Sequence, residues 1–495
     1  MPNVPERFLS LRYPAHALPE YLLKRADWRP YPTIYDRAAW ESLPETVRRA
    51  HIRQGEQALS APWPHLAATN YLNYARNGNR REYERPYFAR RDILVRLALA
   101  ECLENQGRFL DAAADAIWSI CEEATWCLPA HIGAQRAGVG LPDPEEPIVD
   151  LFAAETAALL AWVDYLLGSR LDEVSPRIRE QIGRQVDARI LTPALARDDF
   201  MWMGFQRLPV NNWNPWVNSN WLTCALLLER DEARRLAAVA KILESLDCFI
   251  TPYPQDGGCD EGPSYWGRAG ASLFDNLELL RSVSGGRIDV YADERIRNIG
   301  RFVYRAHIAG DYYVNFADAP ARLTPDPLLV FRFGRQIDDR QMQEFGAWLA
   351  ARKAVLSHGV VTEADIAPSL GRVLAALFTL GELAGVPPRA PLLKSVWLPD
   401  IQVAAGRDEA GSERGFYLAA KGGHNAESHN HNDVGHFIVY RDGLPLIIDV
   451  GVETYTRKTF SPQRYEIWTM QSDYHSLPSV DGVMQVPGRV SAARA

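Results

Sequence analysis

The sequence changes character near residue 385, and this change limits the folds open to the chain. From about residue 40 to 385, apolar residues recur every three or four positions and alanine and leucine dominate, which predicts helices separated by short polar breaks. Several segments are apolar around much of their circumference, and this favours a layered array of helices over a single-skinned bundle. The clearest helical segments are 90–124, 149–168, 218–250 and 267–283.

The chain after this point is predicted to form a sheet. Three prolines in 381–394 break the last helix, and four short runs of alternating residues follow: SVWLPDIQVAAG, RGFYLAAKGG, VGHFIVYRDG and LPLIIDVGVETY. Such alternation predicts antiparallel strands, with Arg441-Asp442-Gly443 as a hairpin turn. We therefore expect an α+β chain of two domains. Residues 1–385 would form an irregular helical bundle or an α/α toroid, and residues 386–495 a β domain that is short for a sandwich of two full sheets.

Composition excludes several classes of protein. With 47% hydrophobic and 23% charged residues, the chain is globular rather than disordered. A formal net charge of -8 argues against nucleic-acid binding, and no run approaches the roughly 18 to 20 apolar residues of a membrane span. The N-terminal segment lacks a signal-peptide pattern, so we expect a cytoplasmic protein, or a periplasmic one if the N-terminus was trimmed. Six cysteines without metal or disulfide spacing predict reduced, mostly buried thiols.

Histidines concentrate in one segment of the β domain. Five of the eleven lie between residues 424 and 475, interleaved with asparagine and aspartate. His429 and His431 are two residues apart, so on a strand their side chains would point the same way. Asp449 falls on the next strand of the expected hairpin, and His475 follows it. Two imidazoles and a carboxylate form a usual first shell for zinc. The alternative is a polar turn with surface histidines, but the density of the cluster favours a site.

A second motif lies in DGGCDEGPSYWGRAG (256–270). Its glycines and proline place Tyr265 at the start of a helix, where a tyrosine can act as acid or base if its neighbours lower its pKa from about 10. A ring packed at a helix N-terminus is the structural alternative. Asp260 and Glu261 add a second chemical option, carboxylate acid–base catalysis of glycoside hydrolysis.

The segment NNWNPWVNSNW (211–221) combines five asparagines with three tryptophans. Indole faces stack on sugar rings, and amides bind hydroxyls or carboxylates. An asparagine-capped helix start with core tryptophans is the alternative. We interpret the segment as a candidate glycan-binding site made of Asn211, Asn212, Trp213, Asn214 and Trp216.

An arginine-rich run over 76–91 is a weaker candidate. Most such runs are solvated helix faces, but in an acidic protein Arg80 and Arg81 are candidates to anchor an anionic ligand. The sequence has neither a phosphate-binding loop nor a nucleophile elbow. We expect no organic cofactor.

Taken in order, NNWNPW, DEGPSYW, and SHNHNDVGHFIVYRDGLPLIIDVG followed by SDYHSLPSV resemble the heparinase II/III-like family of polysaccharide lyases over roughly residues 200–480. The resemblance implies an N-terminal α/α toroid, incomplete here, and a C-terminal antiparallel β-sandwich that looks truncated, with 386–495 as its N-terminal part. It also implies β-elimination at a uronic acid in an acidic polysaccharide or oligosaccharide. The oligomeric state stays open, with a homodimer as one option.

The resemblance also implies roles for individual residues. By position, Tyr265 resembles the catalytic tyrosine, and Asn212 the group that neutralises the uronate carboxylate. His429 resembles the second proton-transfer or neutralising group, and Tyr465 a further catalytic tyrosine. The expected metal is zinc rather than calcium, with a structural role, and its ligands would be His431, Asp449 and His475. We expect Glu261 and Trp266 to contact the substrate with the tryptophan–asparagine segment.

The chain also departs from the family pattern. Members often have Asn-His where this chain has Asn212-Trp213, and Tyr-His where it has Tyr265-Trp266. Both changes remove an imidazole, which leaves more of the acid–base work to Tyr265 and His429. The first hypothesis is therefore a uronate-specific lyase. The alternatives are a toroidal glycoside hydrolase using Asp260 or Glu261, and a non-catalytic glycan-binding relative.

Overall fold

The computed structural model describes residues 7–355 and 369–494 and has the predicted α+β order, with helices first and most strands after residue 394. The chain divides into two compact units. Unit 1 comprises Met1–Thr251, Asp275–Asp289 and Arg352–Ala384, and unit 2 comprises Pro252–Phe274, Val290–Ala351 and Gly385–Ala495. The boundary expected at residue 385 coincides with the start of the last segment of unit 2, which also takes in two segments from the helical region.

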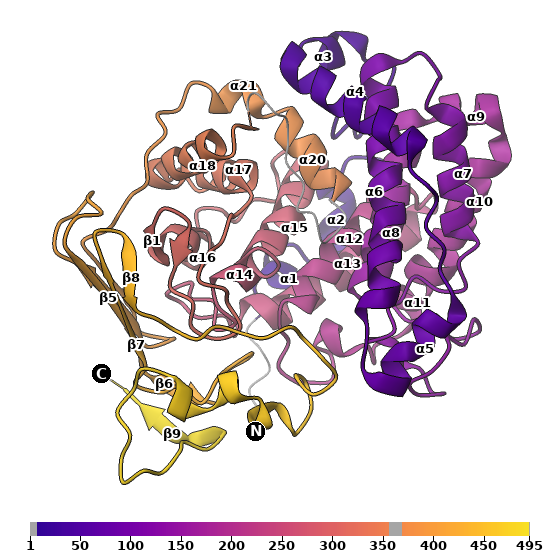
Figure 1. Ribbon diagram of the computed structural model, residues 1–495. Helices are drawn as coiled ribbons and strands as arrows, with labels where there is room; N and C mark the ends of the chain where they lie inside the picture. The colour runs from indigo at the N-terminus through magenta and orange to yellow at the C-terminus, as the bar shows by residue number, and fades with distance from the viewer. Residues whose placement is uncertain (1–6, 356–368, 495) are drawn as a thin grey trace. The chain divides into compact units, whose positions relative to one another are not determined.

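Unit 1 consists of helices that pack against one another in pairs. α4 lies along α6, and α12 lies along both α8 and α13, while α6 and α8 stand side by side (Figure 1). The helices are α1 (Leu9–Arg12), α2 (Leu18–Tyr21), α3 (Arg37–Glu41), α4 (Glu45–Ser60), α5 (Ala68–Asn77), α6 (Arg81–Glu104), α7 (Leu110–Cys121), α8 (Leu151–Leu167), α9 (Ser169–Val174), α10 (Pro176–Val186), α11 (Thr192–Ala196), α12 (Trp213–Leu227), α13 (Glu232–Ile250), α20 (Leu370–Leu377) and α21 (Leu380–Leu383), with α15 (Gly270–Val283) continuing into it from unit 2.

The predicted helical segments are present, but two of them each contain two helices. Segment 90–124 is interrupted between α6 and α7, where Asn105 and Gly107 adopt φ values of 55° and 83°. Left-handed residues of this kind end a helix. Segment 218–250 is interrupted before α13, whose N-cap Asp231 accepts a hydrogen bond from the backbone N–H of Arg234. The six cysteines are unpaired, and five of them are buried, as predicted. Within 7–355 and 369–494, no helix has both the length and the hydropathy needed to cross a membrane.

His51, buried in α4, should make the protein sensitive to acid. Burial lowers its pKa from 6.5 to about 4. The unfolded chain therefore takes up a proton that the folded chain refuses, so the stabilisation is complete above pH 6.5 and is lost as the pH falls from 6.5 towards 4. We expect this histidine to remove about 2 kcal/mol of unfolding free energy between pH 7 and pH 5. Urea titrations at both pH values should show a smaller loss for His51→Gln, and an equal loss in the variant would contradict the assignment.

Unit 2 combines a five-stranded antiparallel sheet of order β3-β4-β5-β7-β8 with short helices and two two-stranded pairs, β1-β2 and β6-β9 (Figure 1). Its elements are α14 (Pro263–Trp266), α16 (Glu294–Arg305), α17 (Pro327–Gln336), α18 (Arg340–Arg352), β1 (His307–Ala309), β2 (Tyr312–Tyr313), β3 (Ser395–Leu398), β4 (Val403–Arg407), β5 (Phe416–Lys421), β6 (Gly423–Asn425), β7 (Phe437–Arg441), β8 (Leu444–Ile447) and β9 (Gly488–Ala493).

The hairpin turn predicted between β7 and β8 is confirmed. Arg441 pairs with Leu444 across the turn, and Asp442 and Gly443 have φ values of 51° and 78°. Two left-handed residues in a two-residue loop are the signature of a type I′ turn, whose twist matches that of the flanking strands. The expectation that Asp449 lies on the second strand of the hairpin is wrong, because β8 ends at Ile447 and Asp449 lies two residues beyond it.

The main sheet buries one face and leaves apolar side chains on the other. Along β5, Tyr417 and Ala419 are buried, whereas Phe416 and Leu418 are about half exposed. Trp397 on β3 is also exposed. An open sheet usually carries polar residues on its solvent face, so this apolar outer face is unusual for a single layer.

Candidate active site and metal centre

The candidate catalytic tyrosine lies on a one-turn helix that packs tightly against a neighbouring segment. Tyr265 belongs to α14, which follows Gly262 with a φ of 94°. A Cβ at Gly262 would lie 2.7 Å from the carbonyl oxygen of Phe316 and 2.9 Å from the Cβ of Ala319. Only glycine combines this backbone conformation with so close an approach. The glycine of the DEGPSYW motif therefore lets the start of α14 pack closely against residues 316–319.

Asp318, at the centre of that segment, is the hub of the site. Its Oδ2 accepts hydrogen bonds from His429 Nδ1 at 2.8 Å and from the Tyr455 hydroxyl at 3.0 Å. Its Oδ1 accepts from His431 Nε2 at 3.0 Å and from Arg464 Nη2 at 2.8 Å. Burial alone would raise the pKa of Asp318, but the hydrogen bonds from the two histidines and the charge of Arg464 hold this pKa well below its ordinary value. The hub is therefore an ionised carboxylate.

The two tyrosine hydroxyls are joined. The oxygens of Tyr265 and Tyr455 are 2.9 Å apart. Because the Tyr455 proton is donated to Asp318, Tyr265 is the donor in this pair. Burial raises the pKa of Tyr455 far above its ordinary value, and the neighbouring Tyr265 and Asp318 raise it further. Tyr455 therefore stays protonated while it holds the Tyr265 oxygen.

His429 lies between two carboxylates and beneath the tyrosine ring. Its Nε2 is 3.2 Å from Glu261 Oε2, while its Nδ1 faces Asp318. The centre of its ring is 4.3 Å from that of Tyr265. The side chain keeps 10% of its surface exposed, and a ligand that displaced Glu261 would gain access to Nε2.

The expectation that His429 and His431 lie on a strand is wrong. Residues 426–436 form a loop between β6 and β7, and His429 itself has a φ of 54°. A left-handed residue cannot continue a strand. The two side chains nevertheless meet, because each reaches a different oxygen of Asp318.

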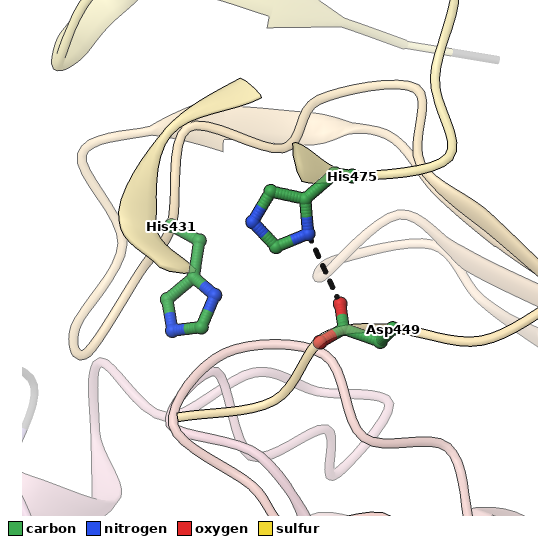
Figure 2. Close-up of side chains that lie close together, drawn as sticks. All are labelled: His431, Asp449 and His475. Atoms are coloured by element: carbon green, nitrogen blue, oxygen red, sulfur yellow. Dashed lines mark ion pairs between the residues drawn. The ribbon is translucent and has the colours of Figure 1, made fainter. Parts of the chain in front are cut away.

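His431, Asp449 and His475 face one another in a buried cluster (Figure 2). One ligand atom from each residue lies within 4.8 Å of the others, and His475 Nδ1 is 3.3 Å from Asp449 Oδ2. The outer nitrogen of each imidazole is already held, His431 Nε2 by Asp318 and His475 Nε2 by the carbonyl of Thr469 at 3.0 Å. Hydrogen bonds of this type orient histidines that bind metals.

The inner atoms of this cluster fit a metal ion. His431 Nδ1, His475 Nδ1 and Asp449 Oδ2 are buried, and none makes a hydrogen bond of good geometry within the described residues, although His475 Nδ1 and Asp449 Oδ2 are in ion-pair range. Leaving such atoms unsatisfied is costly, and a cation would satisfy all three. His436 adds a further imidazole, with Nε2 3.1 Å from Asp449 Oδ2. Imidazole nitrogens favour zinc over calcium, which prefers oxygen ligands.

Other predicted residues of unit 2 have different surroundings. The hydroxyl of Tyr465 donates to Asn430 Oδ1 at 2.7 Å, and it is Tyr455, earlier in the same segment, whose hydroxyl meets Tyr265. Trp266 is 1% exposed, donates to the carbonyl of Ile299 and stacks on Phe333. Asp260 accepts a hydrogen bond from the backbone N–H of Ser428, and burial raises its pKa.

The fold of this chain is similar to that of known proteins. No family model and no curated protein matches the sequence. The structure is similar to a crystal structure of heparinase III, with a TM-score of 0.56 and 13% identity over 96% of this chain and 68% of that one. A second heparinase III structure, with methylated lysines, gives a TM-score of 0.50 and 13% identity over 93% and 65%. The chain has a heparinase-like polysaccharide lyase fold. It spans about two thirds of the length of these two proteins.

The resemblance stated from the motifs is thus confirmed for the fold. The tryptophan–asparagine motif of this fold lies in unit 1, at the start of α12. Asn212 is the N-cap residue and is buried. Asn214 donates to the carbonyls of Trp202 and Ser245, and Trp216 donates to Glu155.

The remaining predicted residues of unit 1 lie nearer the surface. Asn211 Oδ1 accepts from the backbone N–H of Trp213, whose ring meets that of His131 edge-on. Arg80 pairs with Glu84, and Arg81 is exposed at the first position of α6.

Sequence reasoning missed Asp318, Tyr455 and Arg464. Asp318 is the single charged residue in NFADAP (315–320), with none of the clustering that marked the histidines. Tyr455 and Tyr465 lie in one irregular segment, which gives no register for choosing between them. A composition signal was therefore absent, and only the long-range contacts reveal these three residues.

Proposed function

We propose that this protein is a polysaccharide or oligosaccharide lyase that cleaves a uronic-acid-containing glycan by β-elimination and leaves an unsaturated uronate. The main support is the linked group of Tyr265, Tyr455, His429 and Asp318 within a heparinase-like fold. In this group the phenol of Tyr265 and the imidazole of His429 lie next to each other, and the buried carboxylate of Asp318 binds the imidazole. These are the groups that an elimination needs, and no redox step is involved.

The reaction removes the proton at C5 of the uronate and expels the oxygen at C4. We assign proton abstraction to Tyr265, which acts as a base once its hydroxyl proton has passed to solvent. The Tyr455 hydroxyl, 2.9 Å away, can turn its proton towards the resulting phenolate oxygen and stabilise the charge. The Tyr265 phenolate then takes the C5 proton and becomes neutral. The same tyrosine can return the proton to the leaving oxygen when both lie on one face of the sugar.

The negative charge that develops on the uronate carboxylate must also be stabilised. We assign this role to His429, whose Nε2 faces Glu261, and to Asn212 by its resemblance to the neutralising residue of the family. Hydrogen-bond donors aimed at developing charge are typically the largest contribution to such reactions. Glu261 would then release His429 Nε2 as the substrate binds.

We further propose that His431, Asp449 and His475 hold a zinc ion with a structural role. Support comes from the three orphaned, buried ligand atoms and from the outer-nitrogen hydrogen bonds that orient both imidazoles. The ion would join the 426–436 loop to the segments that follow β8, and so fix the backbone that carries His429. The proton transfers above use only side chains of the chain itself.

The finer architecture is also a proposal. The paired packing of helices in unit 1 suits an incomplete α/α toroid. The apolar outer face of the five-stranded sheet suits one layer of a β-sandwich, in which a second layer covers such a face.

The function is tested by incubating the protein with a panel of acidic glycans: heparan sulfate, chondroitin sulfate, hyaluronan, alginate and bacterial uronans. We expect at least one to yield product that absorbs in the ultraviolet, because elimination creates a double bond conjugated to the carboxylate. New reducing ends without that absorbance would instead indicate hydrolysis through Asp260 or Glu261. No cleavage of any member, with binding retained, would favour the non-catalytic relative.

A further inference from the structure

We propose that Asp318 is a positioning residue that couples the metal centre to His429. The inference rests on the proposed function, because it takes His429 as the reacting imidazole and His431 as a metal ligand. One carboxylate binds both histidines, and its side chain is completely buried. It is the direct bridge between the two groups.

The two oxygens of Asp318 bind different groups. Oδ2 accepts hydrogen bonds from His429 and Tyr455, which belong to the proposed reaction site. Oδ1 accepts from His431, a proposed metal ligand, and from Arg464. Each oxygen therefore has two donors at 2.8 to 3.0 Å. Because the carboxylate is planar and rigid, a rotation that improves the contacts of one oxygen must change the contacts of the other.

Asp318 also fixes which nitrogen of each ring carries a proton. By accepting from His431 Nε2, it leaves the lone pair of Nδ1 for the buried cluster with Asp449 and His475. By accepting from His429 Nδ1, it turns Nε2 towards Glu261. Nε2 must carry a proton as well if His429 is to donate a hydrogen bond to the uronate carboxylate. The same residue thus prepares one imidazole for metal binding and the other for the reaction.

The surrounding backbone holds the bridge in place. Ala317, directly before Asp318, has a φ of 63°, and His429 has a φ of 54°. Non-glycine residues are strained in this conformation, and such strain gathers where the rest of the structure enforces it. Arg464 supplies part of that enforcement, because it binds Asp318 and also donates to the carbonyl of Asn430, between the two histidines.

The first test compares Asp318→Asn with a matched control, Asp339→Asn. Asp339 is a largely buried aspartate of unit 2 that binds Arg301 and Tyr304 but no histidine. The amide in Asp318→Asn would keep the shape of the side chain but lose one acceptor and the charge. We expect the dissociation constant for zinc to rise about 10- to 100-fold in Asp318→Asn, measured by competition with a chromogenic chelator, and to stay unchanged in Asp339→Asn.

The kinetic readout separates positioning from simple folding. On the glycan that the wild type cleaves, Asp318→Asn should lower kcat by about 10- to 100-fold with little change in KM, whereas Asp339→Asn should keep both. A variant that melts earlier but binds zinc and turns over like the wild type would overturn the proposal, since Asp318 would then serve only stability.

The second test measures the coupling itself without substrate. Diethyl pyrocarbonate modifies accessible imidazoles, and the rate at His429 is followed by mass spectrometry of its peptide. In the wild type we expect this rate to change severalfold between zinc-free and zinc-loaded protein, and in Asp318→Asn to be the same in both states. Equal rates in the two wild-type states would refute the coupling and leave the lyase proposal standing. A zinc-dependent rate without any unsaturated product would reject the lyase proposal alone.

Discussion

Tyr265→Phe should lower kcat on the cleaved glycan by about 100- to 10,000-fold, the usual contribution of a positioned acid or base. The phenyl ring would keep its packing on His429, with ring centres 4.3 Å apart in the native protein. The loss would therefore come from the missing hydroxyl rather than from a displaced ring. Folding should suffer only slightly, because one hydrogen bond to Tyr455 is removed, worth about 1 kcal/mol.

The matched control is Tyr304→Phe, which removes a buried hydroxyl elsewhere in unit 2. Tyr304 donates to Asp339 rather than to any residue of the Asp318 group. Both variants should show similar melting temperatures and similar zinc content, and only Tyr265→Phe should lose turnover. Initial rates followed by ultraviolet absorbance give the comparison. Turnover within a few fold of wild type in Tyr265→Phe would remove Tyr265 from the mechanism.

Asp449→Ala is expected to produce the largest loss of stability among the site variants. Asp449 carries the negative charge of the proposed zinc cluster, and its pKa is held well below its ordinary value by His436 and His475 against the effect of burial. A ligand that binds only the folded state stabilises it by about 4 kcal/mol when present at about 1,000 times its dissociation constant. Losing the ion should therefore lower the melting temperature clearly, so that the variant loses stability together with activity.

A chelator distinguishes the effect of losing the ion from the effect of losing the Asp449 side chain. A strong chelator should bring the melting temperature of the wild type towards that of Asp449→Ala and leave the variant unchanged. Differential scanning calorimetry with and without added zinc makes the measurement. A variant that remains fully stable but inactive would contradict a structural role and would assign the ion to the reaction instead.

The elements set by local pattern were predictable. Asp442-Gly443 specifies a type I′ turn because both residues tolerate a positive φ, and the structure has that turn. The glycines before Tyr265 likewise mark the start of a short helix, and α14 begins at Pro263. Where a residue type has one strong conformational preference, the sequence is enough.

Features that depend on distant partners were not predictable. Asp318 and His429 are far apart in the sequence, and no local pattern around NFADAP announces that four donors will converge on one carboxylate. The sequence around β7 also suggested that a strand includes His429 and His431. The structure has a loop over 426–436 instead, in which His429 is left-handed. The discontinuous make-up of unit 2 has the same cause, since periodicity shows that a helix face is apolar but not which element covers it.

The central claim, that the chain cleaves by elimination, is tested most directly by weighing both products of one cut. A uronate oligosaccharide of defined length is digested, and the two fragments are measured by mass spectrometry. Elimination adds no water, so the fragment masses should add up to the mass of the substrate, and the new non-reducing end should carry the double bond. Fragment masses that add up to the substrate plus one water, with a saturated new end, would contradict the account.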